Sequence, residues 1–251
     1  MRILAVSLDL DDTLWPVEPA IGGAEQALDA WLRQHLPAVA QAWPIAALRE
    51  LRDRISAQRP DLAHDFTAQR LLTLRHALRS SGIDSEALVQ QAFEVYFKAR
   101  NDVSLYADAL PALTALAARV PLVSISNGNA DLARIGLQRH FRASFSAREL
   151  GMAKPSAGIF HTACAELGLA PEHVLHVGDD PELDVAGARS AGLRSAWLNR
   201  SGGRWPTHGA LAGVRPDLEL RDLGELASRI LAATDADTGA CPAGQRFCVL
   251  P

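Results

Sequence analysis

Hydrophobic and polar positions along the chain follow two periods, one typical of buried strands and the other of amphipathic helices. Ile3–Leu8 is a short, continuous apolar run, which predicts a buried strand of a parallel sheet. From Gly22 to about Asp102 the period becomes helical, and no strand candidate interrupts it. The helices predicted there, separated by proline and glycine breaks, are Ala24–Leu36, Ile45–Ser56, Asp65–Arg79 and Ser85–Arg100. This stretch therefore predicts an inserted, all-helical domain.

Strand and helix patterns alternate after the insertion. The predicted strands are Pro121–Ser126, Ala143–Ser146, Val174–Val177 and Arg194–Leu198. The predicted helices are Leu110–Arg119, Ala130–His140, Ala157–Leu167, Leu183–Ala191 and Leu223–Ala233. Such alternation is typical of an α/β fold with a doubly wound parallel sheet covered by helices on both faces. We expect a core of residues 1–15 and 105–233, a helical cap of residues 16–104, and a poorly ordered tail of residues 234–251.

Carboxylates crowd the end of the first predicted strand, where Asp9-Leu10-Asp11-Asp12 follows the apolar run. In an open parallel sheet, ligands bind just beyond the carboxyl ends of the strands, so Asp9 and Asp11 should emerge there together. Several carboxylates at one place repel each other unless a cation lies among them. A hard, oxygen-preferring cation such as Mg²⁺ is the natural partner. For this segment taken alone, a strand that simply ends in an acidic turn stays open.

Further polar clusters follow predicted strands or precede predicted helices. Ser126-Asn127-Gly128 offers a hydroxyl and backbone N–H groups that suit an anion, although a simple Asn-Gly turn has the same sequence. Lys154 stands before Pro155 and a helix, where an ordinary surface lysine is the alternative. Gly178-Asp179-Asp180 closes another strand, with Asp184 shortly after it, and a plain helix start is the alternative there.

These clusters together indicate phosphoryl transfer. Asp9 is the candidate nucleophile that would form an aspartyl-phosphate with the phosphorus of an ester. Asp11 would protonate the leaving alcohol and then take a proton from the water that hydrolyses the intermediate. Lys154 and a cation held by Asp9 and Asp179 would offset the repulsion between a carboxylate and a phosphate.

The clusters resemble the four motifs of the haloacid dehalogenase-like hydrolase superfamily, in the family's order. The resemblance covers about residues 1–230, and the helical insertion resembles the small cap of that superfamily's first subclass. It implies a Mg²⁺-dependent enzyme with catalytic residues Asp9, Asp11 and Lys154. The metal ligands that it implies are Asp9, Asp11, Asp179 and Asp184. The phosphate contacts that it implies are Thr13, Ser126, Asn127 and Gly128.

A narrower resemblance is to bacterial flavin mononucleotide phosphatases, which also act on 5-amino-6-(5-phospho-D-ribitylamino)uracil. It rests on Ser126–Ala130, His176–Asp180 and a cap segment that contains His64, Asp65 and Arg70. Substrate choice would come from the cap, and Trp15, His64, Asp65 and Arg70 are the candidates for it. The alternatives are packing between domains for Trp15, a surface ion pair for Arg70, and capping of the following helix for His64 and Asp65. Arg70→Ala is therefore predicted to change substrate preference.

Composition narrows the classes of function. A net charge of −4 argues against a nucleic-acid-binding protein, which would carry an excess of basic residues. No apolar run approaches the roughly 18 residues that a membrane-spanning helix needs. The three cysteines are an odd number without metal-ligand spacing, which favours a reduced, cytoplasmic protein. The partner that the phosphatase resemblance implies is a small phosphorylated metabolite. A nucleotide or sugar-phosphate phosphatase is the nearest alternative. More distant ones are a haloacid dehalogenase and a phospho-accepting signalling module.

Overall fold

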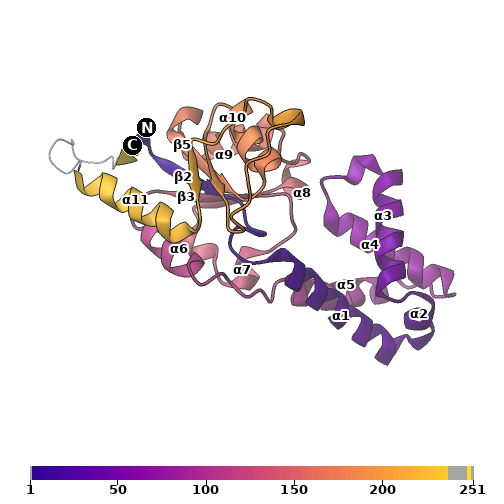
Figure 1. Cartoon of the computed structure of the whole chain (residues 1–251). Coiled ribbons are helices and arrows are strands. Elements are labelled where there is room, and N and C mark those ends of the chain that lie inside the picture. The colour runs from indigo at the N-terminus through magenta and orange to yellow at the C-terminus, as the bar shows by residue number, and fades with distance from the viewer. Residues whose placement is uncertain (1, 237–247, 250–251) are drawn as a thin grey trace. The chain divides into compact units, whose positions relative to one another are not determined.

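The computed structural model describes residues 2–236 and 248–249 of the chain (Figure 1). The chain divides into two compact units. The unit that we call the core comprises Met1–Trp15, Leu105–Gly128 and Gly136–Pro251. The unit that we call the helical unit comprises Pro16–Ser104 and Asn129–Ile135. Residues 129–135, expected in the core, therefore belong with the inserted helices.

A six-stranded parallel sheet, in the order β4-β3-β2-β5-β6-β7, forms the centre of the core. Its strands are β2 (Ala5–Leu8), β3 (Leu122–Ser126), β4 (Ala143–Ser146), β5 (Val174–Gly178), β6 (Arg194–Leu198) and β7 (Leu218–Leu220). Strands β2, β3 and β5 are buried along their whole length, as expected for parallel strands covered on both faces. The predicted α/β class with a doubly wound sheet is confirmed. Only three residues long, β7 is too short to show a period and was not predicted.

Helices cover both faces of this sheet. Figure 1 shows α9 and α10 on one side and α6 and α11 on the other. Their bounds are α6 (Ala109–Ala117), α8 (Ala147–Leu150), α9 (Ala157–Leu167), α10 (Gly187–Ser190) and α11 (Leu223–Ala236). Three 3₁₀ turns accompany them, η2 (Gln138–His140), η3 (Pro171–His173) and η5 (Gly209–Leu211). Ile159 and Phe160 of α9 lie with Val123 and Ile125 of β3 in one apolar cluster of the core.

Two predicted helices are interrupted. The helix expected over Ala130–His140 is only α7 (Leu132–Ile135), because Gly136 adopts a φ of 85° and breaks it before η2. The helix expected over Leu183–Ala191 starts earlier, as the π-helical turn η4 (Pro181–Ala186), and continues as α10. Such π-turns are concentrated at functional sites, and this one carries Asp184.

The two ends of the described chain pair with each other. β1 (Arg2–Ile3) lies antiparallel to β8 (Cys248–Val249) in a two-stranded sheet, and Leu4 separates β1 from β2. The end of α11 and the strand β8 fall within the stretch from residue 234 that the sequence predicts to be poorly ordered, and that expectation stays a prediction. The rest of that tail, residues 237–247 and 250–251, lies outside the described residues.

Amphipathic helices build the helical unit. They are α1 (Val17–His35), α2 (Pro37–Ala42), α3 (Ile45–Gln58), α4 (Phe66–Ser80), α5 (Glu86–Arg100) and α7, with the 3₁₀ turn η1 (Pro60–Leu62). Leu28, Leu32, Leu74, Leu78 and Val89 lie in their common apolar cluster. The six-residue α2 was not predicted because it is too short for a helical period to emerge.

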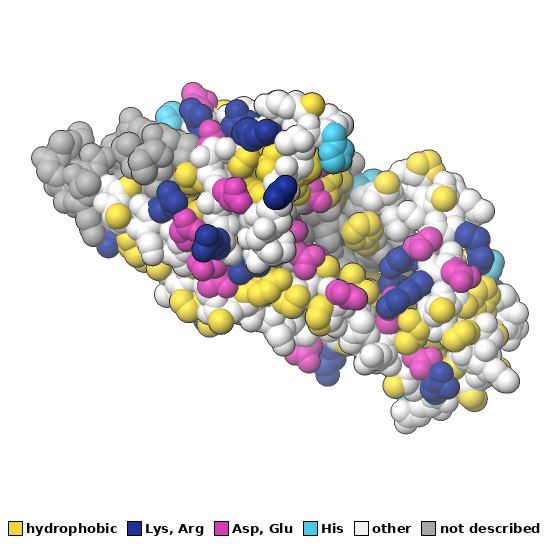
Figure 2. All heavy atoms as spheres, viewed as in Figure 1, with side chains coloured by type: hydrophobic (Ala, Val, Ile, Leu, Met, Phe, Trp, Pro, Cys, Tyr) yellow, Lys and Arg dark blue, Asp and Glu magenta, His cyan; other side chains and the backbone are white. Residues whose placement is uncertain are grey.

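The surface of the helical unit carries charges of both signs. On the face in view in Figure 2, Lys and Arg side chains lie among Asp and Glu side chains there instead of forming one basic patch. Ion pairs between side chains of this unit include Arg59–Asp61, Arg75–Glu86 and Arg79–Asp84. Over the described residues, no helix combines the length and the apolar character that crossing a membrane requires.

Candidate active site

The sheet brings Asp9, Lys154 and Asp184 together at the carboxyl ends of β2 and β5. Asp9 follows β2, and its backbone N–H donates to the carbonyl of Val177 in β5 at 2.9 Å, which extends the strand pairing by one residue. Lys154 Nζ lies 2.6 Å from Asp9 Oδ1 and 2.6 Å from Asp184 Oδ1. Lys154 is 4% exposed, so the alternative of an ordinary surface lysine is wrong.

The backbone of Asp180 and the side chain of His176, which lies outside the four motifs, hold the Asp184 carboxylate in place. Its Oδ2 accepts the backbone N–H of Asp180 at 3.0 Å, and its Oδ1 accepts His176 Nε2 at 3.1 Å. The other ring nitrogen of His176 accepts the Ser7 hydroxyl at 2.9 Å, which leaves the proton on Nε2. Burial lowers the pKa of His176, outweighing the neighbouring carboxylate, so the ring is neutral. At Gly178 any Cβ would overlap the Asp184 carboxylate, and only glycine fits there.

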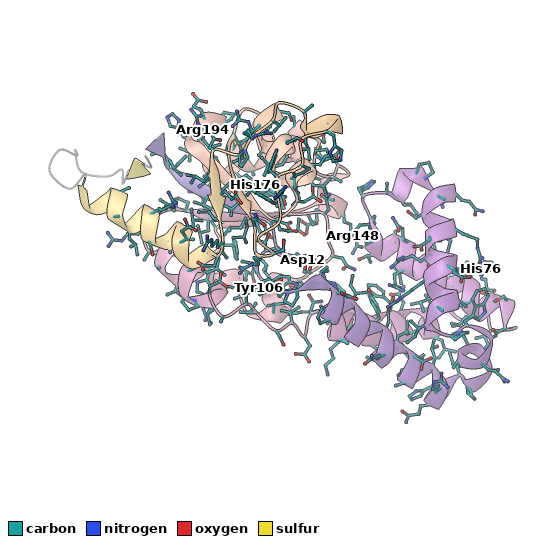
Figure 3. The ribbon with its side chains drawn as sticks, viewed as in Figure 1. Asp12, His76, Tyr106, Arg148, His176 and Arg194 are labelled. Atoms are coloured by element: carbon teal, nitrogen blue, oxygen red, sulfur yellow. The ribbon has the colours of Figure 1, made fainter. Side chains whose placement is uncertain are left out.

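Figure 3 shows His176 inside the core, and its ring packs edge-on against Phe160 with ring centroids 5.0 Å apart. In the sequence, His176 is marked only by the narrower resemblance over His176–Asp180. The signal that it carried was a histidine at an interior position of an otherwise apolar strand, Val174–Gly178. Such a histidine is expected to find buried polar partners.

The pKa shifts of the residues in this cluster indicate that its positive charge does not balance its negative charge. Burial raises the pKa of Asp9 well above its ordinary value, and Lys154 only partly opposes this effect. Burial, with the charge of Asp184, raises the pKa of Asp179 to about 7. Burial acts in the same direction on Asp184, but Lys154 and His176 hold its pKa below the usual range. Burial would lower the pKa of Lys154, but the Asp184 and Asp9 carboxylates raise it, so the amine stays charged.

A divalent cation fits this cluster. Asp9, Asp179 and Asp184 each offer one carboxylate oxygen, and these oxygens lie within 4.8 Å of one another. Three carboxylates gathered with the Lys154 ammonium leave excess negative charge, which hard cations with oxygen ligands neutralise. The Asp11 side chain, also predicted as a ligand, does not belong to this group of three. Thr13 Oγ1 donates to Asp179 Oδ1 at 3.3 Å, so Thr13 orients a carboxylate of the cluster.

The turn that follows Asp11 fixes the orientation of the Asp11 carboxylate. Trp15 Nε1 donates to Asp11 Oδ1 at 2.8 Å, and the Asp12 N–H donates to the Trp15 carbonyl at 2.8 Å. Asp12 closes this turn with a φ of 56°, a left-handed conformation that Asp tolerates better than most residues. Trp15 is fully buried and contacts Asp11, and its predicted contact with substrate stays a prediction.

The Ser126–Gly128 loop lies at the carboxyl end of β3, next to β2 in the sheet. Ser126 Oγ accepts the Gly128 N–H at 3.0 Å, so its own proton can point at an anion. The Asn127 amide donates to the Lys154 carbonyl at 2.9 Å and accepts the Lys154 N–H at 2.8 Å, and its predicted contact with phosphate stays a prediction. Asn127 therefore fixes the backbone that carries the Lys154 ammonium.

Comparison with known proteins now decides the family. A model of the haloacid dehalogenase-like hydrolases matches residues 3–192. The chain belongs to the haloacid dehalogenase-like hydrolase family.

Relatives of this haloacid dehalogenase-like hydrolase have more than one activity. The chain is 30% identical over 236 residues to the 5-amino-6-(5-phospho-D-ribitylamino)uracil phosphatase YigB of Escherichia coli (strain K12), covering 91% of this chain and 97% of YigB. It is 35% identical to the phosphoserine phosphatase of Thermus thermophilus over 158 residues, 61% of each chain. It is also similar to the crystal structure of a 2-haloacid dehalogenase from Pseudomonas syringae pv. Tomato DC3000, with a TM-score of 0.83 and 38% identity over 90% of this chain and 97% of that one.

The predicted substrate contacts on the helical unit of this hydrolase have internal partners. Arg70 is 4% exposed, donates to the Tyr96 hydroxyl at 3.1 Å and lies 3.7 Å from Glu25, which is equally buried. The alternative of a surface ion pair for Arg70 is thus wrong, and any effect of Arg70 on substrate preference would act through the shape of the helical unit. Asp65 accepts the Ala68 N–H at 2.9 Å and caps α4, as its alternative stated. His64, half-buried, lies in the turn before this cap.

Arg70→Ala should lower the free energy of unfolding by ~2 kcal/mol, because it removes the buried guanidinium beside Glu25 Oε1 and its hydrogen bond to Tyr96, although Glu25 Oε2 keeps its ion pair with Arg49 at 2.8 Å. The control Arg75→Ala removes an exposed pair with Glu86 and should cost less than ~1 kcal/mol. Urea denaturation of both variants measures the difference. Equal losses would mean that Arg70 stabilises the helical unit no more than a surface arginine does.

Arg200 supports the turn that follows Asp11, and this role was not predicted from the sequence. It donates to the Thr13 carbonyl at 2.8 Å, makes two hydrogen bonds of 2.9 Å to the Asp108 carboxylate, and stacks on Tyr106 with its guanidinium carbon 3.9 Å from the ring centroid. The Tyr106 N–H in turn donates to the Leu14 carbonyl at 2.9 Å. Arg200 thus fixes the turn that carries Asp11, and Figure 3 shows Tyr106 and Asp12 on the same side of the core. No local pattern marks such a contact, because the residues it joins are far apart in sequence.

Proposed function

We propose that this protein is a Mg²⁺-dependent phosphatase of small phosphorylated metabolites that works through an aspartyl-phosphate on Asp9. The observation that carries the proposal is the buried group of Asp9, Lys154 and Asp184, with Lys154 Nζ 2.6 Å from each carboxylate. A buried carboxylate beside an ammonium and a candidate metal site can approach a phosphate dianion, which would repel it in water. When bound, the cation supplies positive charge to the transferring phosphoryl group.

Each remaining residue of the site has a role in this reaction. Lys154 holds Asp9 in place and offsets the charge of the phosphate. The Ser126 hydroxyl, already oriented by the Gly128 N–H, donates to a phosphate oxygen. Asp11 gives a proton to the leaving alcohol and later accepts one from water, and Asp179 and Asp184 hold the cation together with Asp9.

We propose flavin mononucleotide or 5-amino-6-(5-phospho-D-ribitylamino)uracil as the substrate. Similarity to YigB over nearly the full length of both chains supports this choice over a nucleotide or a sugar phosphate. The cytoplasmic location expected from the sequence stays a prediction.

A haloacid dehalogenase is the second candidate, because a structure of that description is 38% identical to this chain. Such an enzyme also uses an aspartate nucleophile, but a halide leaves as a stable anion and needs no proton donor. The Trp15-oriented Asp11 and the three-carboxylate cluster have no task in that reaction, which favours the phosphatase.

Turnover of a substrate panel tests the proposal. We expect release of inorganic phosphate from flavin mononucleotide, the ribitylaminouracil phosphate, nucleotides and sugar phosphates to require Mg²⁺ and to stop with EDTA. The two flavin-related esters should have the highest kcat/KM. Chloride release from 2-chloropropionate in EDTA, without phosphate release from any ester, would instead establish the dehalogenase.

A further inference from the structure

The carboxyl end of β6 places an indole beside the backbone that carries Asp179. Trp197 lies opposite Gly178 in the pairing of β6 with β5, and its side chain is buried. Its Nε1 donates to the Asp179 carbonyl at 2.8 Å. An indole N–H can donate a hydrogen bond but cannot accept one, so burial of this ring requires an acceptor such as this carbonyl. Trp197 therefore fixes the direction of the peptide group that follows Asp179.

The peptide group between Asp179 and Asp180 is held at both of its polar atoms. Its carbonyl oxygen accepts the Trp197 indole N–H, and its own N–H donates to Asp184 Oδ2 at 3.0 Å. A peptide group is a rigid plane, so its carbonyl and its N–H can only turn together. Trp197 thus acts on the Asp184 carboxylate through one peptide plane.

This plane joins two of the three carboxylates that are proposed to hold the cation. Asp179 precedes the plane, and Asp184 accepts its N–H. The two carboxylates also accept from side chains, Thr13 Oγ1 at 3.3 Å for Asp179 Oδ1 and His176 Nε2 at 3.1 Å for Asp184 Oδ1. Each of these side chains orients one carboxylate, whereas the peptide plane sets the position of one carboxylate relative to the other.

A second indole packs against Trp197. Trp205, in the loop that follows β6, lies edge-on to it with ring centroids 5.1 Å apart and an interplanar angle of 82°, an arrangement that aromatic pairs prefer. Asn199 closes this loop, because its amide donates to the Gly203 carbonyl at 2.8 Å and accepts the Gly203 N–H at 2.9 Å. Trp205 Nε1 is buried and meets no acceptor among the described residues. Trp205 therefore contributes its ring to the pair, whereas Trp197 contributes both its ring and its N–H.

We propose that Trp197 is a positioning residue whose N–H orients the peptide after Asp179 so that the Asp179 and Asp184 carboxylates are spaced for a divalent cation. This inference deepens the proposed function and rests on its Mg²⁺ requirement. Groups that orient metal ligands without touching the metal change its affinity by about 10- to 100-fold when they are removed. Without the indole N–H the peptide plane is free to turn, and binding of Mg²⁺ must then order both carboxylates. Mg²⁺ affinity is therefore the property that Trp197 controls.

Two replacements remove this N–H. Trp197→Phe also removes part of the ring, and β-(3-benzothienyl)alanine at this position replaces the N–H by sulfur while keeping the shape of the ring. Calorimetric titration of the full chain with MgCl₂, without any phosphate ester, measures the Kd of Mg²⁺. We expect both replacements to raise this Kd by about tenfold. Trp205→Phe is the matched control, since it removes an N–H that has no partner among the described residues, and it should leave the Kd unchanged.

Phosphate-release kinetics give a second measurement that general damage to the fold would not reproduce. In both Trp197 variants the Mg²⁺ concentration for half-maximal turnover should rise by about tenfold, while kcat in saturating Mg²⁺ should return to the wild-type value. A kcat that saturating Mg²⁺ does not restore would overturn the inference. An equal rise of the Mg²⁺ Kd in Trp205→Phe would also overturn it, because the effect would then come from packing of the aromatic pair.

The wild-type protein separates this inference from the proposed function. If the wild type binds Mg²⁺ but releases phosphate from no ester, the phosphatase proposal fails, and calorimetry of the Trp197 variants still decides the positioning role. If the wild type is a Mg²⁺-dependent phosphatase and both Trp197 variants keep its Mg²⁺ Kd, the positioning role is wrong and the phosphatase stands. A wild type that binds no Mg²⁺ would overturn both.

Discussion

Asp9→Asn is expected to lower kcat by about 10⁴-fold or more, because an amide is a far weaker nucleophile than a carboxylate. The change preserves the size of the side chain and an oxygen that can accept from Lys154 Nζ, which lies 2.6 Å from Asp9 Oδ1. Phosphate release from the preferred ester measures the loss. Rapid quenching of the wild type, followed by mass spectrometry of the peptide that contains Asp9, should detect the acyl-phosphate that the variant lacks.

Loss of activity in Asp9→Asn should come without loss of stability. Burial raises the pKa of Asp9, which means that folding disfavours its charged form, and a neutral amide avoids that cost. The free energy of unfolding of the variant should therefore equal that of the wild type or exceed it by ~1 kcal/mol. Asp12→Asn is the matched control in the same turn, where asparagine tolerates the left-handed φ of 56°, and it should keep most of the turnover. Full activity of Asp9→Asn would remove Asp9 from its role.

Lys154→Met is expected to reduce kcat by about a thousandfold, because the phosphate then approaches Asp9 without the ammonium that offsets its charge. The same change leaves Asp9 and Asp184 buried with no ammonium between them. Apo protein should therefore lose ~3 kcal/mol of unfolding free energy, of which added Mg²⁺ should restore a part. Urea denaturation with and without Mg²⁺, beside phosphate-release kinetics, measures both effects.

The sequence offers a well-matched control for this variant. The chain contains only two lysines, Lys98 and Lys154. Lys98 lies exposed on α5, and Lys98→Met should change the unfolding free energy by less than ~0.5 kcal/mol and leave turnover intact. If Lys154→Met behaves like Lys98→Met in both measurements, the Lys154 ammonium has no function in the proposed site.

Local pattern predicted most of the elements, because a buried face imposes its period on the residues that form it. The strand Arg194–Leu198 and the helix Ala157–Leu167 have the bounds that their patterns predicted. The pattern failed where an element is too short to show a period, as in α2 and β7, or where a turn departs from the regular helix, as in η4. Within such elements the tertiary structure, not the local period, sets the conformation.

By itself the sequence determined the α/β class, the inserted helices, and the acidic and basic residues that stand at strand ends. It did so because strand ends in a parallel sheet meet at one edge, whatever else the chain contains. Only the tertiary structure decided which atoms meet: Ser7 with His176, which are 169 residues apart, Trp15 with one oxygen of Asp11, and Arg70 with Glu25 inside the helical unit. These contacts depend on the order of the strands and on how each turn closes, and neither leaves a periodic trace in the sequence.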